Sequence, residues 1–290
     1  MAESGAHRLV QNWLGQIVEY EKNWEKSDYV TRKWVEFPVK NRDDYDEMKW
    51  RYDPNNPSLY PNDWEEAVHP YRDRTYPVNI TIPSLFWRVR DWVSLKNLCI
   101  MLHRDPDLVH EMMRFWANFV LKLTRRALRD VDVDYVLLCD DMAYKGRAMI
   151  SPEMMKEFML PHYRRWVTHF KEHGVRIVMM DSDGYLHEIA PVWMEAGINV
   201  LAPIEISAGN GMLRLREELG HRMALMGGID KIKIAQGGRA LDKEFESKVP
   251  QLIRDGGYIP CCDHYIPPNV TYAKYCHYIR LLKRYCGWET

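Results

Sequence analysis

Acidic and imidazole side chains follow short apolar runs repeatedly in this 290-residue chain. The runs have the length of strands, and so many acids at their ends exceed what loop polarity alone requires. Carboxylate and imidazole groups can transfer protons, share a proton or coordinate a cation. The groups lie after five successive runs and are Asp140 with Asp141, Asp181 with Asp183, Glu205, Asp230, and Asp263 with His264. We therefore expect one site built from the ends of several strands.

The elements that must position these groups repeat one pattern of a helical stretch, a glycine and an apolar run. The repeats are KEHGVRIVMMDSDG, MEAGINVLAPIE, EELGHRMALMGGID and RDGGYIPCCDH. Gly174, Gly197, Gly220 and Gly256 with Gly257 lie where the end of a helix favours positive φ. Alternation of helix and strand predicts a parallel sheet with crossover helices, in which ligands bind beyond the carboxyl ends of the strands.

The strand candidates predict an α/β fold of the (β/α)₈ TIM-barrel type. They are WVEFPV, NITI, YVLLC, RIVMM, NVLA, MALM and YIPCC, about seven where a closed barrel needs eight. Either one strand is missed or the first βα unit is abbreviated. We favour an abbreviated unit, because residues 1–34 are interpreted as helical with no strand before them.

The flanking elements divide the chain into an N-terminal segment and a barrel domain. Residues 6–26 place Leu9, Trp13, Ile17, Tyr20 and Trp24 at helical spacing, which predicts an amphipathic helix. Further helices are expected at 43–52, after the Ser151-Pro152-Glu153 start signal, at 185–196 and at 269–285. We expect residues 1–75 to form a helical and irregular segment packed on a barrel domain of residues 76–290.

Composition narrows the class of function. A net charge of −1 with 28% charged residues gives no electrostatic reason to expect nucleic acid or an anionic membrane as partner. No apolar run approaches the roughly 20 residues that span a bilayer, and no signal peptide is recognised. The six cysteines show no regular spacing, which favours a reduced, cytoplasmic protein. Small molecules and proteins remain as partners.

Asp181 and Asp183 are the strongest candidates for chemistry. With Ser182 between them they face one side of a strand end, where they can share a proton, coordinate a cation or accept hydrogen bonds. Asp183 could instead cap the helix expected at 185–196. Asp141 is a catalytic candidate, with a loop residue satisfied by backbone N–H groups as the alternative.

His264 lies between a strand and a proline turn, a poor place for a core histidine. It could act as a ligand or as a general acid or base. The neighbouring Cys261 and Cys262 are better explained by packing than by zinc binding.

Two groups of residues are candidates for substrate binding. Tyr144 and Arg147 in MAYKGRAM could reach an anionic substrate, although a solvated loop explains them equally well. Trp87, Arg88 and Arg90 could frame a carboxylate or phosphate beside an aromatic wall. Their alternative is a helix-surface pair that bridges to Asp91.

A succession of longer motifs resembles the uroporphyrinogen decarboxylase superfamily, in the branch near the corrinoid-dependent methyltransferases. The motifs are LFWRVRDWVSLKNLCIMLHRDPDLVHEMM, ISPEMMKEFMLPHYRRW, MDSDGYLHEIAPVWMEAGINVLAPIEISAG, MALMGGIDK and GGYIPCCDHYIPPNVTYAKY, within about residues 76–285. The resemblance implies a (β/α)₈ barrel with its active site at the carboxyl ends of the strands. The superfamily joins cofactor-independent decarboxylases of uroporphyrinogen with zinc-dependent methyltransferases that serve corrinoid proteins.

This chain departs from both the decarboxylases and the methyltransferases, and these departures help to choose between the two groups. The arginine-rich N-terminal motif of the decarboxylases has no counterpart in this chain. Where the methyltransferases carry a His-x-Cys pair, this chain has Asp181 and Asp183, and their last-strand cysteine falls near Cys261–His264. An oxygen-rich site of Asp181, Asp183, Glu205 and His264 could still hold a divalent metal, zinc by preference.

Three functions follow as hypotheses. The first is methyl transfer between a small methylated compound and a corrinoid protein, with Asp141, Asp183 and His264 as catalytic residues. The second is decarboxylation of uroporphyrinogen or a related carboxylated substrate, a lyase reaction that needs no cofactor. The third is a barrel that binds a ligand without turnover. A homodimer is compatible with the resemblance.

Overall fold

The computed structural model describes residues 2–4, 7–21 and 32–288. The chain forms two compact units, each built from two segments. The first unit contains Met1–Ala67 and Leu85–Arg126, and the second contains Val68–Ser84 and Ala127–Thr290. All the candidate catalytic and metal-binding residues belong to the second unit.

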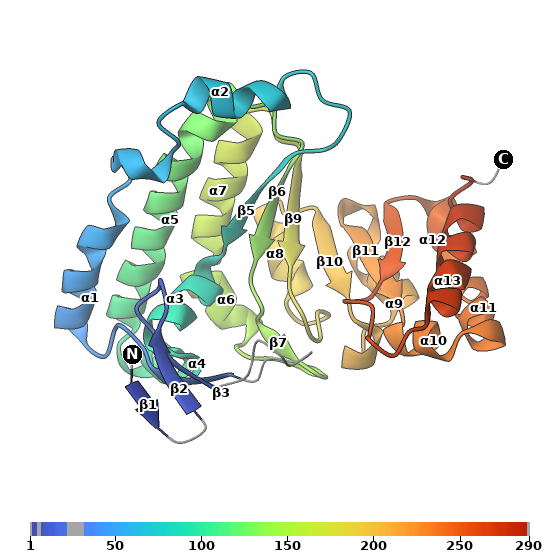
Figure 1. The fold of residues 1–290 in the computed structure, drawn as a ribbon, viewed down its shortest axis with the longest axis horizontal. Coiled ribbons are helices and arrows are strands. Elements are labelled where there is room, and N and C mark those ends of the chain that lie inside the picture. Colours follow the sequence, from blue (N-terminus) through green and yellow to red (C-terminus); the bar gives the residue numbers. More distant parts are fainter. Residues whose placement is uncertain (1, 5–6, 22–31, 289–290) are drawn as a thin grey trace. The chain divides into compact units, whose positions relative to one another are not determined.

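A parallel sheet of six strands forms the centre of the second unit (Figure 1). The strands lie side by side in sequence order: β5 (Asn79–Pro83), β6 (Tyr135–Cys139), β9 (Ile177–Asp181), β10 (Val200–Ile204), β11 (Ala224–Ile229) and β12 (Tyr258–Cys262). This sequential order is that of a (β/α)₈ barrel, and the predicted α/β class is confirmed. Within the described residues the sheet does not close into a barrel, since β5 and β12 form its two edges.

Both faces of this sheet carry apolar side chains, as expected for parallel strands covered by crossover helices. On one face Met179, Val200 and Ala202 pack together with Leu137 and Met226. The alternate positions, such as Val136, Val178 and Leu201, are fully buried. The residues at the strand ends are therefore attached to strands whose side chains are packed on both faces of the sheet.

Helices connect and cover the strands of the second unit. They are α6 (Pro152–Phe158), α7 (Leu160–Glu172), α8 (Ala190–Ala196), α9 (Met212–Leu219), α10 (Lys231–Gln236), α11 (Gly238–Glu246), α12 (Val249–Asp255) and α13 (Tyr272–Tyr285). The predicted start of α6 is confirmed, because the Ser151 side chain accepts a hydrogen bond from the backbone N–H of Met154. The glycines of the repeated pattern have positive φ as predicted, with 88° at Gly174 and 92° at Gly197.

The first unit combines helices with an antiparallel sheet. Its strands are β1 (Ala2–Ser4), β2 (His7–Gln11), β3 (Ile17–Glu21) and β4 (Arg32–Glu36), in that spatial order. Its helices are α1 (Arg42–Met48), α3 (Leu85–Val93), α4 (Leu95–Arg104) and most of α5 (Pro106–Asp130). The residues of α2 (Trp64–Val68) are divided, with Trp64–Ala67 in the first unit and Val68 in the second. The expected helix at 43–52 is confirmed as α1 followed by a 3₁₀ turn.

The helix predicted over residues 6–26 is wrong where the structure describes it. Residues 7–21 form the hairpin of β2 and β3 instead, while residues 6 and 22–26, with Trp24, lie outside the described residues. The Asn12 side chain accepts hydrogen bonds from the backbone N–H groups of Leu14 and Gln16, and Gly15 adopts a φ of +84°. This turn chemistry outweighs the helical spacing of the aromatic residues.

The candidate strand WVEFPV overlaps β4 and therefore belongs to the antiparallel sheet. Removing it from the parallel count leaves the six strands observed. A barrel domain of residues 76–290, with residues 1–75 packed on it, stays a prediction. Among the helices of the described chain, none combines the length and the apolar character that a membrane span needs.

Candidate active site

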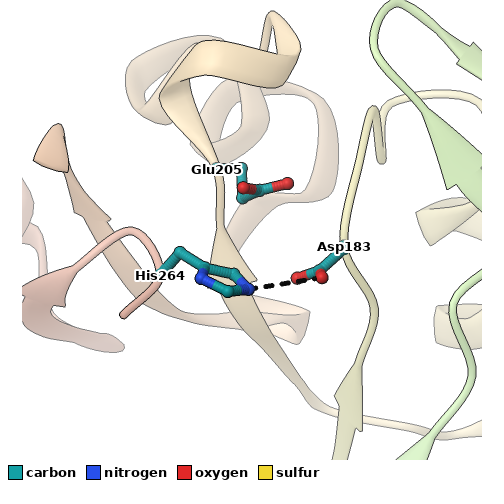
Figure 2. A group of neighbouring side chains, drawn as sticks. All are labelled: Asp183, Glu205 and His264. Carbon is teal, nitrogen blue, oxygen red and sulfur yellow. Dashed lines mark ion pairs between the residues drawn. The ribbon is translucent and has the colours of Figure 1, made fainter. Parts of the chain in front are cut away.

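Three of the four predicted metal ligands lie together at the carboxyl ends of the parallel strands (Figure 2). Each of Asp183, Glu205 and His264 offers one ligand atom, and these atoms lie within 4.8 Å of one another. Nε2 of His264 lies 3.4 Å from Oδ2 of Asp183, and the two side chains point toward each other. The three residues follow β9, β10 and β12, so the sheet brings together groups that are distant in sequence.

Asp183 occupies a turn that only glycine at the next position allows. Gly184 has a φ of +90°, and a Cβ atom on it would lie 2.5 Å from the carbonyl oxygen of Ala143. The backbone N–H of Gly184 donates to Oε2 of Glu205 at 3.1 Å, which joins the two ligand segments directly. Helix α8 begins only at Ala190, with Ile189 as its N-cap, so Asp183 does not cap that helix.

Glu205 is held at both carboxylate oxygens. Besides the bond from Gly184, Oε1 accepts a hydrogen bond from Nζ of Lys231 at 2.7 Å. Burial by itself would raise the pKa of Glu205, but the bonds from Lys231 and Gly184 outweigh burial and hold the pKa below its usual value. Glu205 is therefore ionised at neutral pH and fixed in direction.

Asp263 joins three of the segments that follow the strands of the site. Its side chain is fully buried and accepts hydrogen bonds from the backbone N–H groups of Ile206 at 3.0 Å and Lys231 at 2.9 Å. One carboxylate thus connects the segments after β10, β11 and β12, and it precedes His264 directly. Asp230 serves α10 in another way, as an N-cap that accepts from the N–H of Ile232.

Asn210 ties the same segments together from another side. Its buried side chain donates to the carbonyl oxygens of Gly184 at 2.7 Å and Glu205 at 2.9 Å, and accepts from the N–H of Leu186 at 2.9 Å. This role is not predictable from the sequence, because an asparagine between two glycines is typical of a simple turn. Lys231 is also not among the residues that the sequence pattern predicts, although a basic residue directly after the strand-end Asp230 is a usable signal.

Asp181 and Asp141 place further negative charge beside this cluster. Burial, followed by the charges of Asp141 and Asp183, raises the pKa of Asp181 to about 6. Burial and the charge of Asp141 also raise the pKa of Asp183, and His264 opposes this change. Asp181 contacts the Cys139 thiol at 3.7 Å and is not one of the three clustered ligands.

Two other predicted aspartates have structural contacts. Oδ1 of Asp141 accepts from the backbone N–H of Asp183 at 3.1 Å, which matches the alternative of a loop residue satisfied by backbone and also positions Asp183. Asp140 is fully buried and accepts a hydrogen bond from the Tyr163 hydroxyl. A catalytic role for Asp141 stays a prediction.

Tyr144 and Arg147 lie on a short hairpin of β7 (Ala143–Tyr144) and β8 (Arg147–Ala148), and both are exposed. The carbonyl of Tyr144 accepts from the N–H of Tyr185, and the N–H of Gly146 donates to the carbonyl of Ala208, both at 3.0 Å. The hairpin is thus fastened to the segments that follow Asp183 and Glu205. This position is compatible with contact to a substrate.

Trp87, Arg88 and Arg90 lie on α3, in the first unit. The Arg88 side chain is buried, with its guanidinium 4.6 Å from the ring centre of Trp116 and Nη1 3.8 Å from Asp91. The Arg90 guanidinium lies 4.9 Å from the ring centre of Trp87. These contacts match the alternative of a pair used within the helix and its neighbours, and substrate binding by these residues stays a prediction.

No thiol belongs to the three-ligand cluster, as far as the chain is described. Burial raises the pKa of Cys261 to about 11, so the neutral thiol dominates there. Cys262 packs against an apolar cluster formed by Ile229 of β11 and side chains of α10–α13. This contact agrees with a packing role for Cys262, and the role of Cys261 stays a prediction.

Comparison with known proteins supports one family. Residues 92–285 match the family model described as uroporphyrinogen decarboxylase (URO-D). A solved structure of a methyltransferase from Methanosarcina mazei is similar to the chain, with a TM-score of 0.59, 12% identity, and coverage of 88% of this chain and 73% of that one. At this identity the likeness concerns the fold. No curated protein sequence matches the chain significantly.

Proposed function

The chain belongs to the uroporphyrinogen decarboxylase family, and from that premise and the geometry of its site we propose that it is an enzyme of methyl transfer. The reaction would move a methyl group between a small methylated compound and a corrinoid carried by a partner protein. The convergence of Asp183, Glu205 and His264 on one position is the observation that carries this proposal.

The three residues fit a divalent cation. Two carboxylates and one imidazole form a donor set that suits zinc as well as harder ions. When bound, such an ion would act as a Lewis acid that activates the heteroatom accepting or releasing the methyl group. Asp181 is not part of this donor set in the structure and takes another role in the proposal.

The remaining groups of the site accept a proton, position Asp183 or contact the substrate. A thiol or amine that accepts a methyl group loses a proton, and Asp181, with its pKa raised to about 6, is suited to receive it near neutral pH. Asp141 holds the backbone of Asp183 in place. Tyr144 and Arg147, on the exposed hairpin, would contact the substrate.

Decarboxylation is the second candidate, and one observation favours it. Glu205 pairs with the Lys231 ammonium group, so one carboxylate of the site already has a cationic partner without any ion, and Asp183 lies 3.4 Å from His264. On this view Asp141 or Asp183 would stabilise a cationic intermediate, and His264 would face the departing carboxylate. No cofactor would be needed.

Absorbance spectroscopy separates the two reactions. The zinc-loaded protein would be incubated with methylcobalamin and a panel of small thiols and amines, and the visible spectrum of the corrinoid would be followed. Methyl transfer predicts loss of the methylcobalamin spectrum with at least one acceptor, and no loss with a folded Asp183→Asn variant. Release of carboxyl groups from uroporphyrinogen without any change of methylcobalamin would favour the decarboxylase, and neither reaction would favour a barrel without turnover.

We further expect the protein to act in the cytoplasm. Self-association as a homodimer remains an expectation that gel filtration with light scattering would test.

A further inference from the structure

We propose that Lys231 competes with the bound cation for Glu205, so that the Lys231 ammonium group limits the metal affinity of the site. This inference rests on the proposed function in one respect, namely that Asp183, Glu205 and His264 bind a divalent ion. It adds a residue that decides how tightly that ion is held.

A metal ion at this site needs an oxygen of Glu205, and both oxygens already accept a hydrogen bond. Nζ of Lys231 lies 2.7 Å from Oε1 of Glu205, while the N–H of Gly184 occupies Oε2 at 3.1 Å. The side chains of Lys231 and Glu205 are only 24% and 15% exposed, so water screens the pair less than it would a surface pair. A cation that approaches Glu205 therefore meets a positive charge already in place.

The backbone of Lys231 cannot move away easily, but its side chain can. The backbone N–H of Lys231 donates to the buried carboxylate of Asp263, and Lys231 is the first residue of α10. Four rotatable methylene bonds separate this fixed point from the ammonium group. Metal binding is thus expected to rotate the lysine side chain off Glu205 while helix α10 stays where it is.

The size of the effect follows from Coulomb's law. Once the lysine side chain has rotated off Glu205 into solvent, its charge still acts on the ion. At about 5 Å and a dielectric close to that of water, one positive charge opposes binding of a divalent ion by roughly 10- to 100-fold in affinity. Replacing Lys231 with methionine keeps the length of the side chain and removes the charge. Zinc affinity should then rise by about that factor.

Isothermal titration calorimetry of Zn²⁺ into the full-length protein tests whether removal of the Lys231 charge raises the zinc affinity. The variants are Lys231→Met and Lys231→Arg, and Lys233→Met is the matched control. Lys233 is on the same helix and contacts Gln236 rather than the ligand cluster. Replacing Lys233 with methionine therefore changes the net charge by the same amount as Lys231→Met without touching the site. A parallel titration with Co²⁺, followed by its absorption bands, shows whether thiolates take part. Thermal melting establishes that each variant is folded.

The proposal predicts tighter zinc binding in Lys231→Met, and affinities close to wild type in Lys231→Arg and Lys233→Met. Equal affinity of Lys231→Met and wild type, both at the three-residue site, would overturn the competition and leave the metal-dependent function standing. A rise of the same size in Lys233→Met would also overturn it, because net charge alone would explain the gain. Failure of every folded variant to bind metal would overturn this inference and the metal part of the proposed function together.

A second readout does not depend on a variant folding. Amine-directed labelling of the wild-type protein, read by peptide mass spectrometry, should modify Lys231 several-fold faster when zinc is bound, because the ammonium group has left Glu205. Lys248, which pairs with Glu244 away from the ligand cluster, serves as internal control. Unchanged labelling of Lys231 at saturating zinc would contradict the proposal.

Discussion

Replacing Gly184 with alanine should damage the site through backbone geometry alone. Gly184 has a φ of +90°, a conformation that costs an alanine about 1–2 kcal/mol. Its new Cβ would also lie 2.5 Å from the carbonyl oxygen of Ala143, too close for either backbone segment to stay in place. Relief of such a clash costs about 1–3 kcal/mol more. We therefore expect the free energy of unfolding to fall by about 2–5 kcal/mol.

A second glycine separates these two costs. Gly174 has a φ of +88°, and a Cβ atom there would meet no atom within 4 Å. Gly174→Ala should therefore lose only the conformational part, about 1–2 kcal/mol. The difference between the two variants isolates the close approach beside Asp183.

Urea unfolding followed by circular dichroism gives both free energies, provided the m-values stay equal. Zinc titration gives the second readout, because displacement of the Asp183–Gly184 turn separates Asp183 from Glu205. Gly184→Ala should weaken zinc binding at least tenfold, and Gly174→Ala should not. Equal loss of stability in both variants, with zinc affinity unchanged, would refute the argument that this turn sets the ligand geometry.

Further predictions concern buried polar groups. Asn210→Ala should lower the free energy of unfolding by about 2–3 kcal/mol, since it leaves the buried Leu186 N–H without its acceptor, and it should also weaken zinc binding. Asn199→Ala removes two hydrogen bonds away from the site, so it should lower stability and leave zinc affinity unchanged; equal zinc affinities in the two variants would contradict the positioning role of Asn210. The pKa of Asp181 is raised from 3.8 to about 6, so the folded state binds its proton more tightly and the contribution of this group to stability falls as pH rises from about 4 to 6. In chelator, Asp181→Asn should therefore gain stability relative to wild type across that range, and a constant difference from pH 4 to 7 would argue against the raised pKa.

The strand-end residues were predictable because of the regularity of the βα repeat. The glycines and apolar runs locate the ends of β9, β10, β11 and β12 within three residues, and parallel strands necessarily gather their carboxyl ends at one edge. The sequence pattern alone therefore predicts that Asp183, Glu205 and His264 lie together. The spacing of apolar residues and the positions of the turn glycines are sufficient to predict this part of the site.

The contacts that complete the site depend on distances across the sheet, which a single sequence does not report. Asp263 looks like any other strand-end acid, yet it is the buried acceptor that joins Ile206 and Lys231. Lys231 directly follows Asp230, and the pattern of acids at strand ends predicts a site role for Asp230, which only caps α10, and none for the lysine. The N-terminal hairpin was missed for a different reason, since its aromatic residues also fit a helical period.

Metal content tests the central claim most directly, that Asp183, Glu205 and His264 form one metal centre. Inductively coupled plasma mass spectrometry would measure the metal content of the wild-type protein and of the variants Asp183→Ala, Glu205→Ala and His264→Ala. All four proteins would first be loaded with zinc in the same way and freed of the excess. The account predicts near-stoichiometric metal in the wild type and its loss in each folded variant. Wild-type protein that stays free of metal after loading, or variants that retain as much metal as wild type, would contradict it.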